Sequence, residues 1–245
     1  MNIKDIQKFC KTNLNPINIF KTIAFKLCFF RDNPNYFDPD GIWIFSGPQG
    51  SGKTLTACKC FKEILKTYPN ALICSNLQVN GIDNEVIPFT DYSQLENLSN
   101  GTDGVIFLID EIHVLWNSLE SKNIPISEMA CFCQMRKDRR VIIGTAQVYS
   151  RIAKPIREQL KYVVKCKNIL GILQYNTIID PTEYGDDNGE CVGDIISRQL
   201  FFHSPDDYLS YDTLTKINRF DRKKDKKIKS KGCDNNVSYS VRIVC

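Results

Sequence analysis

The stretch Gly47-Pro48-Gln49-Gly50-Ser51-Gly52-Lys53-Thr54 decides how this chain folds. Two glycines five residues apart, followed by Lys and Thr, fit the pattern of a phosphate-binding loop. Glycines allow backbone N–H groups to converge on phosphate oxygens. We therefore expect Lys53 to reach the β- and γ-phosphates of a nucleotide, and the Thr54 hydroxyl to ligate Mg²⁺.

The residues on either side supply the context that such a loop requires. Ile42-Trp43-Ile44-Phe45 is a short apolar run typical of a buried strand. After the loop, apolar residues recur at helical spacing, which predicts a helix from Lys53 to about Tyr68. The amino end of that helix would add partial positive charge where the phosphates bind.

Short apolar runs alternate with helical patterns along the rest of the chain. We expect strands at 71–74, 86–89, 105–109, 140–145 and 162–164, helices at 92–98, 127–135 and 152–160, and β-like segments at 169–180 and 194–202. Alternation of this kind predicts a parallel sheet with helices on both faces. The continuous apolar run 105–109 is typical of a central strand. The predicted class is therefore α/β, with a β-rich C-terminal extension.

Two acids follow the predicted central strand. The strand carries Asp110 and Glu111 to the edge of the sheet beside the phosphate loop. We expect Asp110 to hold Mg²⁺ through water and Glu111 to polarise an attacking water. An acid directly after the Mg²⁺ acid favours hydrolysis over kinase-type transfer.

A second polar position follows the strand predicted at 140–145. The amide of Gln147 can donate to a γ-phosphate and accept from the lytic water, which would make it a nucleotide sensor. The basic segment 136–140 before this strand is expected to be mostly a solvated turn. His113 and His203 are single histidines without evident partners, so we expect core or surface roles for them.

Composition and charge set the broad class. The chain has 245 residues, 42% of them hydrophobic and 24% charged, enough for a sizeable core. Its 11 cysteines are odd in number and scattered, so we expect reduced thiols packed as small hydrophobes. No run approaches the roughly 20 apolar residues that span a bilayer. We expect a soluble, intracellular protein.

We divide the chain into three parts. Residues 1–40 form an N-terminal helical arm, whose helix near 19–30 is expected to pack on the core. Residues 41–213 form a P-loop ATPase domain. Residues 214–245 form a basic tail, predicted to be disordered. Within the tail, residues 216–231 hold nine basic and two acidic residues, so this segment carries +7 and leaves −3 of the total charge of +4 for the rest.

These elements together resemble the FtsK–HerA superfamily of DNA-translocating ATPases, over roughly Gly41 to Thr213. The likeness rests on Gly47 to Thr54, on Val105 to Glu111, and on Met135 to Gln147. Within the superfamily the chain resembles the genome-packaging ATPases of tailless icosahedral double-stranded DNA viruses. The resemblance implies a RecA-like P-loop fold, with ATP and Mg²⁺ as ligands.

The resemblance also implies partners and a role for an arginine. It places Arg136 as an arginine finger before the strand that ends in the sensor Gln147, with Arg139 and Arg140 as competitors. It implies a homo-oligomeric ring, a pentamer or hexamer, acting on double-stranded DNA and on a capsid protein. The expected location is the host cytoplasm, a viral factory or the virion.

Alternatives remain open. The motifs, with Ser75-Asn76-Leu77, also resemble the zonular occludens toxin-like ATPases of filamentous phage assembly. Those proteins continue into a transmembrane segment and a further domain that we do not expect here, which favours packaging. AAA+ proteins fit less well, because they place a helical lid where residues 161–202 look rich in strands. A nucleotide-gated assembly factor without translocation is a third interpretation.

Overall fold

The computed structural model describes residues 16–33, 36–181, 186–187 and 190–212. Within these residues eight strands form one sheet, in the order β10-β7-β6-β1-β5-β4-β2-β3. The strands are β1 (Gly41–Ser46), β2 (Leu72–Ser75), β3 (Val86–Pro88), β4 (Val105–Ile109), β5 (Arg140–Ala146), β6 (Leu160–Ile169), β7 (Leu173–Asp180) and β10 (Asp194–Phe202). A separate small ribbon pairs β8 (Asp186–Asp187) with β9 (Glu190–Cys191).

The sheet is parallel from β6 to β3 and antiparallel at its other end. Strand β1 pairs in parallel with β5 on one side and β6 on the other. Strands β6, β7 and β10 then pair antiparallel, as the predicted β-rich extension. Because the parallel strands share one direction, the segments that leave β1, β4 and β5 meet at one edge of the sheet.

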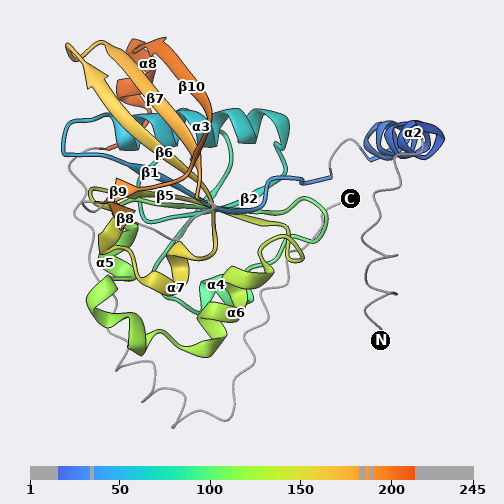
Figure 1. Cartoon of the computed structure of the whole chain (residues 1–245), viewed down its shortest axis with the longest axis horizontal. Coiled ribbons are helices and arrows are strands. Elements are labelled where there is room, and N and C mark those ends of the chain that lie inside the picture. The colour runs from blue at the N-terminus through green and yellow to red at the C-terminus, as the bar shows by residue number, and fades with distance from the viewer. Residues whose placement is uncertain (1–15, 34–35, 182–185, 188–189, 213–245) are drawn as a thin grey trace, which may run out of the picture.

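Helices cover both faces of the sheet, as predicted (Figure 1). One face carries α3 (Lys53–Thr67), with α8 (Pro205–Leu209) at its amino-terminal half. The other carries α4 (Gln94–Asn97), α5 (Ile112–Leu115), α6 (Ile126–Gln134) and α7 (Lys154–Arg157), with the 3₁₀ turns η1 (Ser118–Asn123) and η2 (Tyr149–Arg151). The amphipathic pattern of α3 accounts for its place, because Ala57, Phe61 and Leu65 all point into the core.

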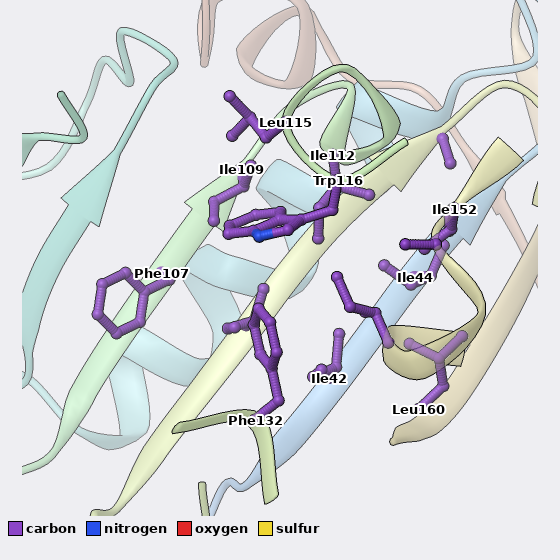
Figure 2. Close-up of a cluster of buried hydrophobic side chains, with 14 of the residues drawn as sticks. Ile42, Ile44, Phe107, Ile109, Ile112, Leu115, Trp116, Phe132, Ile152 and Leu160 are labelled. Carbon is purple, nitrogen blue, oxygen red and sulfur yellow. The ribbon is translucent and has the colours of Figure 1, made fainter. Parts of the chain in front are cut away.

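Two apolar clusters hold these layers together, one on each face of the sheet. Every residue of β4 and β5 is buried, as a strand covered on both faces requires. On the face away from α3, Trp116 packs edge-on against Phe132, and strand residues such as Ile42 and Ile44 lie beneath them (Figure 2). The acids after β4 thus follow a fully buried strand, and the loop after β1 follows a strand whose last three residues are all buried.

One expectation about an individual element is wrong, and another is confirmed except in its first few residues. Helix α2 (Pro16–Asp32) does not pack on the core: Phe20, Phe25 and Leu27 are 67–77% exposed. The β-like segment expected at 169–180 is strand β7 from Leu173 onward. A hairpin turn precedes this strand, in which Leu170 and Gly171 both have positive φ, as a primed turn requires.

Two further sequence expectations concern membranes and the tail. In the described part of the chain, no helix has the length and apolar character to cross a bilayer. The basic tail predicted at 214–245 lies outside the described residues.

Candidate active site

The glycine loop runs from the end of β1 into α3. Gly47 N donates to Ala146 O of β5 over 3.3 Å, which fixes the start of the loop. Gly50 and Gly52 have φ of 77° and 80°, in the left-handed region that favours glycine. A Cβ on Gly52 would lie 2.1 Å from Oε1 of Gln174, so no other residue fits there without displacing that side chain.

The side chains of the loop are poised for an anionic ligand. Lys53 is 7% exposed, and its Nζ donates to Pro48 O over 3.1 Å. Ser51 Oγ is buried, with no hydrogen-bond partner among the described residues. A cation, an unpaired hydroxyl and the amino end of a 15-residue helix lie together, which fits the phosphates of a nucleotide.

Thr54 and Asp110 are brought together as predicted. Thr54 Oγ1 donates to Asp110 Oδ1 over 3.0 Å, although 56 residues separate them. Thr145, at the end of β5, also donates to this oxygen, over 2.7 Å. Carboxylate and hydroxyl oxygens are ligands that suit Mg²⁺, so the residues present fit that ion. When bound, Mg²⁺ offsets the charge of the nucleotide phosphates.

Two residues outside the predicted set fix this edge. Thr145 Oγ1 also accepts from Glu111 N over 2.9 Å, so one hydroxyl links both acids. Asn76, after β2, holds the backbone of Asp110 from the other side: its Oδ1 accepts from Asp110 N over 2.8 Å, and its Nδ2 donates to Asp110 O over 3.0 Å. In the sequence, both stand at or just after a strand end and within stretches that carry a family resemblance, but neither was predicted as a site residue.

Glu111 and Gln147 are also adjacent. Gln147 Nε2 donates to Glu111 Oε1 over 3.3 Å. Glu111 has φ of 50°, an unusual conformation for this residue, and it caps α5. Burial raises the pKa of Glu111, and the nearby Asp110 adds to this, while the Gln147 hydrogen bond and the Lys53 charge oppose it. The structure therefore holds a carboxylate beside an amide at the predicted site of water attack.

His203 has hydrogen-bonding partners, contrary to expectation, whereas His113 is a buried residue, as expected of a core role. His113 is buried, and its Nδ1 lies 3.3 Å from Glu111 Oε2. Burial lowers the pKa of His113, and the positive charges of Arg151 and Lys53 lower it further, so its neutral form is favoured. His203 Nε2 lies 3.2 Å from Gln174 Oε1 beside the glycine loop. Neither contact was visible in sequence, because both depend on long-range folding.

The three candidate arginines occupy different environments, all at the amino end of β5. Arg140 is buried, and its guanidinium donates to the carbonyls of Leu95 and Glu96. Arg139 lies over the Tyr36 ring, 4.5 Å from its centroid. Arg136 is exposed. The seven residues of β5, about 20 Å, separate this end from the glycine loop of the same chain.

A glycine loop between β1 and α3, with an Asp-Glu pair at the end of β4 on the far side of β5, defines a P-loop nucleotide-binding ATPase domain. The chain belongs to the ATPase family associated with various cellular activities (AAA), which matches residues 43–167, just over half of its length. This match corrects the expectation that AAA+ proteins fit less well. The observation behind that expectation is nevertheless confirmed: residues 161–202 are rich in strands, because β6, β7 and β10 occupy most of them.

Solved structures with a similar fold include the N-terminal domain of zonular occludens toxin from Neisseria meningitidis. Its TM-score is 0.54 at 14% identity, over 70% of this chain and 98% of that domain. The genome packaging NTPase B204 from Sulfolobus turreted icosahedral virus 2 has a TM-score of 0.47 at 13% identity, over 69% and 98%. The flagellar accessory protein FlaH from Methanocaldococcus jannaschii has 0.38 at 13%, over 57% and 77%. No curated protein sequence matches the chain.

Proposed function

We propose that this ATPase is a DNA-translocating motor that packages double-stranded viral DNA into a capsid. The observation that carries the proposal is the bond between Gln147 and Glu111. An amide that touches both the catalytic carboxylate and the nucleotide can report which nucleotide is bound, as a motor requires. The sequence resemblance to FtsK–HerA packaging ATPases supplies the substrate class.

The residues divide the work of hydrolysis as follows. The loop Gly47–Thr54 binds the phosphates, with Lys53 opposite the β- and γ-phosphates. Thr54 and Asp110 would hold Mg²⁺. Glu111 accepts a proton from the attacking water. As the water oxygen bonds to the γ-phosphorus, the bond between that phosphorus and the bridging oxygen breaks, and ADP leaves. Gln147 keeps the Glu111 carboxylate in place and reaches the γ-phosphate.

Exposed Arg136 is the favoured trans finger in this proposal. Among the three arginines, Arg140 is committed to buried carbonyls and Arg139 to Tyr36. Because Arg136 lies at the far end of β5 from its own nucleotide loop, it can serve a nucleotide only on a neighbouring subunit. A finger of this kind contributes about 10³–10⁵ in rate in other systems.

A second function is favoured by the fold. The N-terminal domain of zonular occludens toxin matches over 98% of its length, and Asn76 of the Ser75-Asn76-Leu77 stretch holds Asp110. The chain would then drive filamentous phage assembly. A nucleotide-gated assembly factor would hydrolyse ATP without moving DNA.

The ATPase rate with and without double-stranded DNA tests the motor. We expect duplex DNA to raise the rate several-fold, and mass measurement with bound nucleotide to give a pentamer or hexamer. Glu111→Gln should retain ATP without turnover, whereas Lys53→Ala should weaken nucleotide binding. A monomer whose rate ignores DNA would favour the assembly factor.

A further inference from the structure

A buried glutamine outside the known P-loop motifs grips the nucleotide loop. Gln174, on β7, is 0% exposed and lies 123 residues after Ser51. Its Nε2 donates to Ser51 O over 3.0 Å and to Asn176 Oδ1 over 2.9 Å. Both amide hydrogens are therefore used, and Oε1 is the acceptor that faces His203.

His203 and Tyr208 support this glutamine from behind. Because Oε1 of Gln174 can only accept, His203 carries a hydrogen on Nε2, which lies 3.2 Å away. His203 Nδ1 lies 2.6 Å from the Tyr208 hydroxyl, and that hydroxyl lies 2.7 Å from Gly171 O. A chain of polar contacts thus runs from the β6–β7 turn, through α8 and the end of β10, to the glycine loop.

The grip fixes the direction of one loop peptide. In a trans peptide the C=O and N–H groups point in opposite directions, and no described peptide of this chain is cis. Since Ser51 O points to Gln174, the Gly52 N–H points away from β7. The loop must be glycine here to admit Gln174, whose Oε1 lies 2.1 Å from the position of a Cβ.

We propose that Gln174 is a positioning residue of the nucleotide site, which holds the Ser51–Gly52 peptide with its N–H free for a phosphate oxygen. The C-terminal hairpin and α8 are then part of the nucleotide-binding machinery. Preorganisation of this kind strengthens binding because the ligand no longer has to order the loop. The inference rests on nucleotide binding by the ATPase domain, and not on DNA translocation.

The test compares two Gln→Met variants of the full chain. Gln174→Met keeps the length of the side chain but removes its donors and acceptor, and Gln199→Met makes the same change on the exposed β10. We expect Gln174→Met to raise the Kd for ADP and the KM for ATP about tenfold, the effect of one lost hydrogen bond to phosphate. The kcat should stay within about twofold, because the contact serves substrate and transition state alike. Gln199→Met should match wild type.

A purely structural role would lower the thermal midpoint and leave the ADP affinity of folded protein unchanged. That result for Gln174→Met would overturn the inference. If Gln174→Met does not fold, His203→Phe takes its place. This change removes the hydrogen-bond partner of Gln174 Oε1, and since His203 is partly exposed, the variant is expected to fold. We expect its Kd for ADP to rise about threefold, and an unchanged Kd would again overturn the inference. These assays contain no DNA, so their outcome tests the role of Gln174 and does not depend on whether the protein translocates DNA.

Discussion

Asp110 Oδ1 accepts hydrogen bonds from two hydroxyls, Thr54 and Thr145, and the second hydroxyl also binds the backbone of Glu111. Both acids therefore depend on a threonine that was not among the predicted site residues. Thr145 is 1% exposed, so its hydroxyl serves these contacts and not solvent. We expect Thr145 to fix the spacing of the two carboxylates.

Thr145→Val tests this role, because valine has the same shape and lacks the hydroxyl. We expect kcat to fall about tenfold, since the loss of one buried hydrogen bond costs about 1–1.5 kcal/mol and frees both acids to shift. Steady-state ATPase kinetics would measure kcat, and thermal unfolding would check that the variant is folded. Thr67→Val, at the far end of α3, is the control, since its hydroxyl donates to Glu63 O of its own helix. Parental kcat in Thr145→Val would refute the role.

Cysteine reactivity offers a second test at this scale. Burial raises the pKa of Cys58, Cys74 and Cys166 to about 12, so at pH 8 these thiols stay protonated and unreactive. We expect alkylation of the native protein at exposed Cys28 and Cys133 but not at the buried three, as read by peptide mass spectrometry. Denatured protein should be labelled at all of them. Labelling of Cys74 in the native state would contradict its burial.

Which site residues can be predicted from sequence depends on how local their signals are. Lys53, Thr54, Asp110 and Glu111 were predicted to share one sheet edge, because each follows a strand that periodicity identifies, and the structure brings them together. Their roles in catalysis stay predictions. Gln174 has no such signal, since only the pairing of β6 with β7 brings it to the loop.

At the scale of elements, the carboxylate of Asp207 links α8 to α3. Asp207 accepts from Ser204 N in a capping box, and its carboxylate lies 3.3 Å from Lys59 Nζ. Burial alone would raise the pKa of Asp207, but the Ser204 hydrogen bonds and the Lys59 charge lower it below its usual value. The ionised form therefore stabilises the fold.

Asp207→Ala should lower the free energy of unfolding by about 1 kcal/mol at neutral pH, the usual cost of a lost cap. Because the folded pKa is lowered, this stabilisation is present above the unfolded pKa and is lost as pH falls through the folded value. The difference from wild type should therefore shrink in acid. Urea titrations at pH 7 and pH 3 would measure it. Asp206→Ala, on the same helix but exposed, is the control.

Elements were predictable where periodicity was sustained, and less so where tertiary contacts decide. Most sheet strands and α3 were predicted within a few residues of their bounds, but β6 runs to Ile169, well beyond the strand predicted at 162–164. The short helix α5 was missed, since it occupies only four residues and follows the left-handed N-cap residue Glu111. Helix α2 was predicted as a helix, but its apolar residues are exposed, and no local pattern tells a packed helix from an unpacked one.

At the scale of the whole molecule, the position of Arg136 allows a test of whether the active unit is a ring in which one subunit supplies an arginine to the next. Arg136→Ala and Glu111→Gln should each be inactive alone. In mixed rings, an Arg136→Ala subunit keeps its own Glu111 and can use the arginine of a Glu111→Gln neighbour. We therefore expect ATPase activity to return in part on mixing, as a function of the ratio of the two variants.

Lys137→Ala, an exposed neighbour, should be active alone and is the control for loss of charge. Subunit exchange must be shown by mass. If exchange occurs and no activity returns, Arg136 is not a trans finger. Arg139 is then the next to test, because Arg140 is held inside the subunit.

The contact between Gln174 and Ser51 also determines when, during translation, the glycine loop can be fixed. The glycine loop leaves the ribosome 123 residues before the side chain that holds it. At about 5–20 residues per second, the nascent loop exists for roughly 6–25 s before Gln174 is made. During that interval β1 and α3 can form, but the Ser51–Gly52 peptide is not yet fixed. Full affinity for ATP is therefore expected late in the synthesis of the chain, and a chain stalled on the ribosome before β7 has the complete glycine loop without the Gln174 contact that positions it.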